Sequence, residues 1–324
     1  MSDAVISVRD LQTTFHTKVG PIRAVDGISY DIERGKTLGI VGESGCGKSV
    51  TSYSLMRLIE HPGEITAGEV YLHGENLLEL SDEQMADYRG RRMAMIFQEP
   101  MTALNPVLTI GYQMDEQIMR HLSLPRKASR ERALEMLDMV GIPAPKERYA
   151  SYPHQLSGGM RQRVMIAMAL SCEPDFLIAD EPTTALDVTI QGQILELIQR
   201  LQQQLDMSVQ FITHDLGVIS EIADDVLVMY AGTACEMAPT GELIAGPRHP
   251  YTAALLLSIP QLGRRLERLP TIEGTVPSLF ELPAGCPFQN RCPRVSDECR
   301  AARPALQTLA PGHQVACFNP LEPT

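Results

Sequence analysis

The sequence predicts an α/β protein whose helices cover a mostly parallel β-sheet. Helix-like segments at 191–205 and 216–223 separate strand-like segments, and strands that alternate with helices indicate parallel pairing. A chain of 324 residues can form one large α/β domain and a smaller appendage, or two modest domains. Short apolar runs typical of buried strands are TLGIV at 37–41, FLIAD at 176–180, SVQFIT at 208–213 and DVLVMY at 225–230.

The N-terminal part of the chain predicts further elements in order. Alternating apolar and polar residues at 6–15 and 24–32 predict two strands, and the segment 50–60 predicts a helix. Glycines spaced along 63–80 indicate a small antiparallel element.

The later part of the chain predicts a helical segment and then a change of domain. Apolar residues recur at helical spacing in 126–140, and Gly141 is typical of the residue that follows a helix. After about Gly241 the composition becomes richer in Pro, Arg and Cys. We therefore expect a domain at 1–240, with a helical subdomain at about 99–164, and a C-terminal extension at 241–324.

The charge balance argues against some classes of partner, with a local basic patch as the alternative. The chain has 28 Lys and Arg against 40 Asp and Glu, a formal net charge of -12. This balance opposes broad binding to nucleic acid or to an anionic membrane surface. The first residues show no secretory signal, and no apolar run approaches the length of a membrane span. We therefore expect a cytosolic protein whose seven cysteines do not form structural disulfides.

The segment GESGCGKS, 42–49, matches the pattern of a phosphate-binding loop between a strand and a helix. Its glycines let backbone N–H groups point at phosphate oxygens, and the helix N-terminus adds its positive dipole end. Lys48 would reach the β and γ phosphates, and Ser49 would bind Mg2+. A structural glycine turn is the alternative. The candidate ATP contacts are Gly42, Glu43, Ser44, Gly45, Cys46, Gly47, Lys48, Ser49 and Val50.

A pair of acidic residues follows the apolar run 176–179. Asp180 would hold Mg2+, and Glu181 would activate the water that attacks the γ-phosphorus. Because phosphoryl transfer needs mainly positioning and charge neutralisation, one acid for the metal and one for the water are sufficient. The alternative is a strand that ends in a solvated acidic turn.

The segment LSGGMRQR, 156–163, predicts a helix whose N-terminus binds an anion. Ser157 is a good N-cap, and Gly158 and Gly159 keep the start of the helix accessible. One chain therefore has two phosphate-binding helix ends, which suggests that a second copy of the fold shares them.

From about Val5 to Gly241 these residues resemble the ATP-binding cassette (ABC) ATPases. LSGGM resembles the signature motif, IFQEP the Q-loop, ALD at 185–187 the D-loop, and FITHD the segment with the switch histidine. The resemblance implies a P-loop NTPase fold with a RecA-like core, an antiparallel β subdomain and a helical signature subdomain. It also implies a head-to-tail dimer that ATP closes and hydrolysis opens.

The resemblance assigns roles to individual residues. Phe15 would stack on adenine, although an ordinary core or surface phenylalanine is the alternative. Asp187 would belong to the D-loop. The implied catalytic residues are Lys48, Gln98, Glu181 and His214; the implied Mg2+ ligands are Ser49, Gln98 and Asp180; and the implied contacts to the partner's ATP are Ser157, Gly158 and Gly159.

Two classes of ABC ATPase compete, transporter subunits and soluble ATPases. The segment between Gln98 and Ser157 is too short for the insertions of the repair and chromosome types, and the chain has one cassette where the translation-factor type has two. RHPYTAALLLSIP at 248–260 resembles the start of the C-terminal extension in oligopeptide and dipeptide importer ATPases. The resemblance implies ATP hydrolysis that energises the import of dipeptides or short oligopeptides. The alternative is the same role in importing nickel, glutathione or another small solute, which related importers carry.

The importer resemblance also implies partners and a location. The chain would pair with a second, similar ATPase in a heterodimer, and would bind two membrane permease subunits. An external solute-binding protein would act indirectly, and nucleic acid would not be a partner. The chain would lie at the cytoplasmic face of the bacterial inner membrane as a peripheral protein.

Four cysteines gather near the end of the chain, at Cys286, Cys292, Cys299 and Cys317. Their spacing differs from the paired C-x2-C knuckles of structural zinc, and a proline follows two of them. Loops of this kind can enclose a cluster that needs four thiolates. Peptide importer ATPases carry a similar set, and the resemblance implies a [4Fe-4S] cluster. Zn2+ and the absence of any metal are the alternatives.

Overall fold

The structure, a computed structural model, describes residues 4–99, 103–184, 187–258 and 271–322. The chain divides into two compact units. The first unit comprises Met1–Val5, Glu33–Lys36 and Glu79–Gln210. The second unit comprises Ile6–Ile32, Thr37–Leu78 and Phe211–Thr324.

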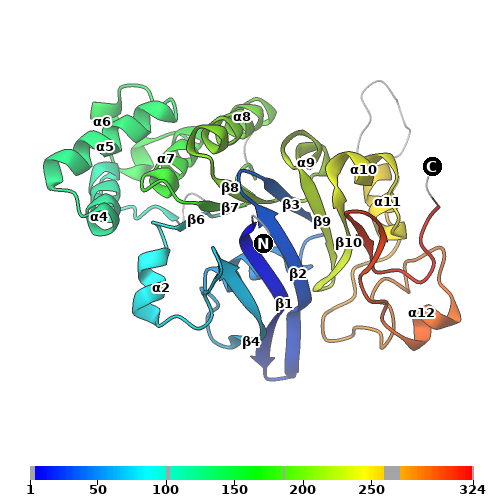
Figure 1. The fold of residues 1–324 in the computed structure, drawn as a ribbon. Helices are drawn as coiled ribbons and strands as arrows, with labels where there is room; N and C mark the ends of the chain where they lie inside the picture. Colours follow the sequence, from blue (N-terminus) through cyan, green and yellow to red (C-terminus); the bar gives the residue numbers. More distant parts are fainter. Residues whose placement is uncertain (1–3, 100–102, 185–186, 259–270, 323–324) are drawn as a thin grey trace. The chain divides into compact units, whose positions relative to one another are not determined.

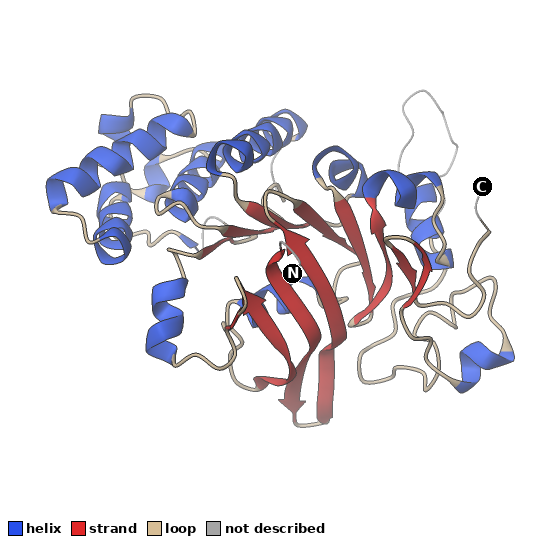
Figure 2. Cartoon of the chain, in the orientation of Figure 1, coloured by secondary structure: helices blue, strands red, loops and turns tan. Residues whose placement is uncertain are grey.

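The first unit contains most of the helices, which Figure 2 distinguishes by colour. β8 (Ser208–Ile212) begins at the end of this unit. The other elements of the unit are α2 (Asp82–Tyr88), β6 (Met93–Ile96), α4 (Ile110–Leu122), α5 (Arg126–Met139), α6 (Pro145–Tyr149), a short 3-10 helix (Pro153–Gln155), α7 (Gly158–Leu170), β7 (Phe176–Asp180) and α8 (Val188–Leu205).

The core of the first unit combines a parallel strand pair with packed helices. β6 and β7 are parallel, with Met93 opposite Phe176, and every residue of both strands is buried. Helices α4, α5 and α7 pack together, and Ile110, Met114 and Ile118 recur on one face of α4 with no exposed surface. The predicted helix at 126–140 is present as α5, whereas α4 was not predicted. The expected bounds of the helical subdomain remain a prediction.

The second unit contains most of the strands. Its elements, shown in Figure 1, are β1 (Ala4–Thr17), β2 (Gly20–Glu33), β3 (Thr37–Val41), α1 (Lys48–Leu55), β4 (Gly63–Leu72), β5 (Glu75–Asn76), α9 (Leu216–Ile222), β9 (Asp225–Tyr230), β10 (Thr233–Pro239), α10 (Thr240–Ala245), α11 (Pro250–Leu257), α12 (Asp297–Ala301), β11 (Gln307–Ala310) and β12 (His313–Val315). Helix α1 ends earlier than the predicted 50–60, because Arg57 adopts a left-handed φ of 49° that a helix cannot continue through.

Two sheets organise the second unit. The antiparallel sheet has the order β2-β1-β4-β5, which confirms the small antiparallel element expected at 63–80. In the other sheet, β3 is parallel to β9, and the order continues through β10, β12 and β11. These last three strands pair antiparallel, so this edge of the sheet departs from the mostly parallel arrangement that we expected.

The residues after 240 pair with, and form hydrogen bonds to, strand β10, which precedes them. β12 pairs with β10, with Glu236 opposite Val315. Glu236 has no exposed surface, and its carboxylate accepts hydrogen bonds from the backbone N–H groups of Arg248 (2.6 Å) and His249 (2.9 Å). The same carboxylate lies 2.7 Å from Nε2 of His313. Glu236 therefore joins β10, β12 and the start of α11. The domain boundary at 240 and 241 remains a prediction.

Within the described ranges, no helix combines the length and the apolar character that crossing a lipid bilayer requires.

Candidate active site

Strand β3 leads directly into the phosphate loop of the second unit. All residues of β3 are buried, and Gly47, with a φ of 102°, occupies the N-cap position of α1. A Cβ atom at Gly42 would collide with the carbonyl oxygen of Met229, and one at Gly47 would collide with that of Ala24. Only glycine fits at these two positions, so the backbone can curl tightly ahead of the helix.

Lys48 points back across the phosphate loop. Its Nζ donates to the carbonyl oxygens of Gly42 (2.8 Å) and Glu43 (3.1 Å), and the residue is 5% exposed. Cys46 is buried beneath the loop, and burial raises the pKa of its thiol although the charge of Lys48 opposes the rise. An ammonium group held by two backbone carbonyls at the start of a helix is placed to receive phosphate oxygens.

The other predicted loop residues are less enclosed. Ser44 and Gly45 are exposed at the crest of the loop, and Ser49 and Val50 are half-buried in the first turn of α1. The sequence-predicted set from Gly42 to Val50 therefore forms one continuous turn from strand to helix.

Phe15 lies near the end of β1, half-buried and in register with Gly63 of β4. The strand is tied to the helix that follows the phosphate loop, because Thr13 Oγ1 and Ser54 Oγ share a hydrogen bond of 2.7 Å. The expected contact of Phe15 with adenine remains a prediction.

The acidic pair of the first unit lies at the end of β7. Asp180 has no exposed surface, and Glu181 follows it with a left-handed φ of 44°. A residue other than glycine rarely adopts this conformation, and such backbone is often found at functional sites.

Gln98 and Glu181 meet in the first unit. Nε2 of Gln98 donates to Oε2 of Glu181 at 3.1 Å, and the hydroxyl of Thr184 donates to the same oxygen at 2.9 Å. The structure thus brings together Gln98 and Glu181, whose roles as Q-loop glutamine and general base remain predictions. Thr184 was not predicted, although its position three residues after Glu181 in a turn could have indicated a hydrogen bond between the two side chains.

Ser157, Gly158 and Gly159 form the start of α7 as expected. The Ser157 hydroxyl accepts a hydrogen bond from Met160 N at 3.3 Å, which confirms the predicted N-cap. Ser157 and Gly158 are exposed and Gly159 is half-buried, so this helix end is open to a ligand or a second chain.

Asp187 and His214 each lie at a helix start. Asp187 caps α8 by accepting from Ile190 N at 2.9 Å, while the other two residues of the ALD segment, 185 and 186, lie outside the described residues. His214 is exposed after β8, and Asp215 next to it caps α9 through Gly217 N at 2.8 Å. The D-loop and switch roles of Asp187 and His214 remain predictions.

The four C-terminal cysteines are near one another but do not form a ligand group. The backbone N–H of Cys286 donates to the carbonyl oxygen of Cys299 at 2.8 Å. Burial is the main cause that raises the pKa of the Cys286 thiol, and the neighbouring thiols of Cys299 and Cys292 add to the rise. Among the residues that the structure describes, no three His, Cys, Asp or Glu side chains are arranged to hold a metal ion. The structure therefore does not support the expected [4Fe-4S] cluster, nor Zn2+, at these four cysteines.

Two family models match the chain. The model described as ABC transporter matches residues 25–184, and the model described as oligopeptide/dipeptide transporter, C-terminal region, matches residues 235–299. The dipeptide transport ATP-binding protein DppD of Bacillus subtilis is 50% identical over 317 residues, which cover 98% of this chain and 95% of that protein. The chain belongs to the ABC transporter ATP-binding proteins.

Other ABC proteins are similar over most of the chain. DppD of Escherichia coli, also a dipeptide transport ATP-binding protein, is 48% identical over 98% of each chain. Among solved structures, the ATP-binding cassette MJ0796, a dimer in a post-hydrolysis state bound to ADP and phosphate, superposes with a TM-score of 0.66 at 27% identity. That likeness covers 72% of this chain and 98% of the cassette, so the ABC fold accounts for most of the chain.

Two residues at the phosphate loop of this ABC protein were not predicted. The hydroxyl oxygen of Tyr251 accepts a hydrogen bond from Glu43 N at 3.0 Å, and the guanidinium of Arg291 pairs with the Glu43 carboxylate. Tyr251 lies in the RHPYT segment, which the sequence marked only by resemblance. No local pattern indicated Arg291, because it lies 248 residues from its partner.

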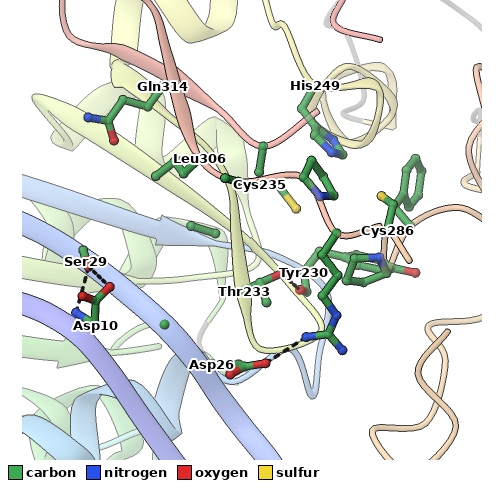
Figure 3. A pocket seen from close by; sticks show the side chains of 18 residues that line it. Asp10, Asp26, Ser29, Tyr230, Thr233, Cys235, His249, Cys286, Leu306 and Gln314 are labelled. Atoms are coloured by element: carbon green, nitrogen blue, oxygen red, sulfur yellow. Dashed lines mark hydrogen bonds and ion pairs between the residues drawn. The ribbon is translucent and has the colours of Figure 1, made fainter. Parts of the chain in front are cut away.

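A cavity of about 520 Å³ lies elsewhere in the second unit (Figure 3). Arg303 and Asp26 form an ion pair of 2.8 Å at its wall, and Asp10 and Ser29 are hydrogen-bonded beside them. Its lining contains no residue of the 42–49 segment, so this cavity is separate from the phosphate loop.

Proposed function

We propose that the chain hydrolyses ATP to energise the import of dipeptides or short oligopeptides. The observation that carries this proposal is the likeness to dipeptide transport ATP-binding proteins over 98% of the chain. This likeness includes the C-terminal region, which matches the oligopeptide/dipeptide transporter model. The phosphate loop, with its buried lysine at a helix start, supports the nucleotide chemistry.

Different residues of the chain bind the triphosphate and activate the water. The loop N–H groups and Lys48 bind and orient the triphosphate. Glu181 accepts the proton of the attacking water, and its hydrogen bonds from Gln98 and Thr184 fix the direction of the carboxylate. His214 contacts the γ-phosphate.

The donor set fits Mg2+ by its chemistry. A hydroxyl from Ser49, a carboxylate from Asp180 and an amide oxygen from Gln98 are all hard oxygen ligands, which this ion prefers. When bound, Mg2+ neutralises charge on the β and γ phosphates.

The partners follow from the importer function. Ser157, Gly158 and Gly159 bind the ATP held by a second, homologous ATPase, and the two chains form a heterodimer. This dimer acts on two membrane permease subunits at the cytoplasmic face of the bacterial inner membrane. An external solute-binding protein delivers the peptide.

Growth of a deletion strain tests the proposed function. A strain that requires an amino acid and lacks this chain should not grow when that amino acid is supplied as a dipeptide, and should grow when it is supplied free. The wild-type chain should restore growth on the dipeptide, and the Lys48→Ala variant should not. Restoration by Lys48→Ala, or normal growth of the deletion strain, would contradict the proposal.

For the four cysteines we propose a metal, with [4Fe-4S] before Zn2+. The support is chemical: Arg294 N–H donates to Cys292 Sγ at 3.4 Å, a hydrogen bond that would stabilise a thiolate. Binding would require the four thiols to adopt an arrangement that they do not have here. Anaerobic purification followed by iron, sulfide and zinc analysis tests this, with Cys299→Ser as the comparison. A wild-type protein that contains neither metal contradicts it.

A further inference from the structure

The carboxylate of Glu43, the second residue of the phosphate loop, is held by Arg291 in a two-bond fork. Nη1 of Arg291 lies 2.6 Å from Oε2, and Nη2 lies 3.0 Å from Oε1. The Arg291 side chain is 4% exposed and that of Glu43 is 29% exposed. Paired charge-assisted bonds of this kind fix direction as well as distance, and partial burial protects them from solvent.

Arg291 is itself held before it reaches Glu43. Its Nε donates to the carbonyl of Glu273 at 3.0 Å, and Nη2 donates to that of Ile272 at 3.3 Å. The guanidinium also lies over the Tyr230 ring, 5.9 Å from its centroid. Because these contacts already restrict the side chain, little conformational entropy remains to be lost in binding Glu43.

The backbone of Glu43 is fixed by a second residue from the C-terminal part of the chain. Its N–H donates to the hydroxyl of Tyr251 at 3.0 Å. Tyr251 has no exposed surface, and its ring packs edge-on against Tyr230 with centroids 4.8 Å apart. Its backbone N–H donates to Nδ1 of His249 at 3.0 Å, and together with the buried ring packing this bond restricts the position of the phenol.

Glu43 connects these contacts to the phosphate-binding lysine. The carbonyl oxygen of Glu43 accepts from Lys48 Nζ at 3.1 Å, so side chain, N–H and carbonyl of one loop residue all have partners. If Glu43 moves, one of the two carbonyls that hold the ammonium moves with it. Arg291 and Tyr251 can therefore affect phosphate binding without touching the nucleotide.

We propose that Arg291 and Tyr251, which lie C-terminal to the ABC core motifs, are positioning residues that hold the phosphate loop in its ATP-binding form. This inference rests on the proposed function, because it takes ATP as the ligand of the loop. The C-terminal region is then a part of the nucleotide site, in addition to any role that its cysteines have.

Nucleotide titration of the full-length chain tests the proposal. The Kd for a fluorescent ATP analogue with Mg2+ should rise about tenfold in Arg291→Gln, because the fork and its charge are lost. Arg291→Lys keeps the positive charge but cannot form the two-bond fork, so its Kd should lie between those of the wild type and Arg291→Gln. Tyr251→Phe removes only the hydroxyl and should raise Kd about threefold.

A matched control separates positioning from general loosening of the C-terminal region. Arg303 pairs with Asp26 at 2.8 Å, and so also links the C-terminal region to the N-terminal strands, but it has no contact to the phosphate loop among the hydrogen bonds described for it. Arg303→Gln should leave Kd within about twofold. An equal rise in Kd for Arg303→Gln and Arg291→Gln would overturn the proposal.

A single variant on the loop side keeps the test decisive if Arg291→Gln folds poorly. Glu43→Gln cuts the same pair from the loop side, and the double variant Glu43→Gln/Arg291→Gln should bind no more weakly than the weaker single variant. Unchanged Kd in folded Arg291→Gln or in Glu43→Gln contradicts the positioning role. Failure of the wild-type chain to bind the analogue would instead contradict the proposed function.

Discussion

Glu181 combines a left-handed backbone with a carboxylate oxygen that accepts hydrogen bonds from Gln98 and Thr184. Replacing Glu181 by Gln keeps the size of the side chain and removes its capacity to accept a proton. We expect phosphate release to fall at least about hundredfold while ATP binding persists, because general-base catalysis contributes on that order. Phosphate release and nucleotide binding should be measured on the same preparation.

A matched control for Glu181 is Glu173, an exposed glutamate of the same unit that pairs with Arg132 at 2.7 Å. Glu173→Gln should hydrolyse ATP at the wild-type rate. Normal turnover in Glu181→Gln, or equal loss in both variants, would mean that Glu181 is not the general base.

At the scale of elements, the Glu236 carboxylate joins β10, β12 and the start of α11 through His313 and two backbone N–H groups. Glu236→Leu leaves these buried donors unpaired. We expect the free energy of unfolding to fall by about 3 to 5 kcal/mol. Urea unfolding at pH 7 checks this, and the exposed Glu242→Gln on α10 should change the value by less than about 0.5 kcal/mol. Similar midpoints for wild type and Glu236→Leu would refute the prediction.

The start of α11 should also make stability depend on pH. Burial lowers the pKa of His249 from 6.5 to about 4, although a backbone hydrogen bond with Ala316 opposes the shift. Between these two values the unfolded chain binds a proton that the folded chain does not. The contribution of His249 to the free energy of unfolding is therefore constant above pH 6.5 and is lost progressively as the pH falls towards 4. At pH 5 the loss should be about 2 kcal/mol.

His249→Asn isolates this effect, because asparagine can still accept the Tyr251 N–H at the helix start but does not titrate. The difference in unfolding free energy between pH 7 and pH 5, measured in urea, should be smaller in His249→Asn than in wild type. The same difference in both proteins would show that His249 does not carry the pH dependence.

At the scale of whole molecules, the proposed dimer depends on the exposed start of α7. In the Glu181→Gln background, ATP should hold this chain and its partner ATPase together, and light scattering should report the dimer. Adding Ser157→Arg should abolish the dimer, because it removes the cap and blocks the helix end, while ATP binding to the phosphate loop persists. Ser123→Arg, at the exposed end of α4, is the control that should still dimerise. A dimer in both variants would exclude α7 from the interface.

Local patterns predicted the parts of the site that depend on short segments. The phosphate loop, the buried β7 with its two acids and the Ser157 cap each follow from a few adjacent residues. The alternation of apolar and polar residues did not predict β11 and β12, because these strands have only four and three residues and β11 is mostly exposed. Nor could it predict the pairing of Arg291 with Glu43, because no local periodicity encodes a contact between residues 248 positions apart.

The pairing of β10 with β12 has a consequence for synthesis of the chain. Glu236 and His313 are 77 residues apart, so β10 leaves the ribosome well before its neighbour exists. During that interval β10 presents unpaired N–H and C=O groups, and the Glu236 carboxylate lacks its imidazole partner. Unpaired strand edges template association with other chains. Nascent or prematurely terminated chains that end before β12 are therefore the forms most exposed to aggregation and to capture by chaperones.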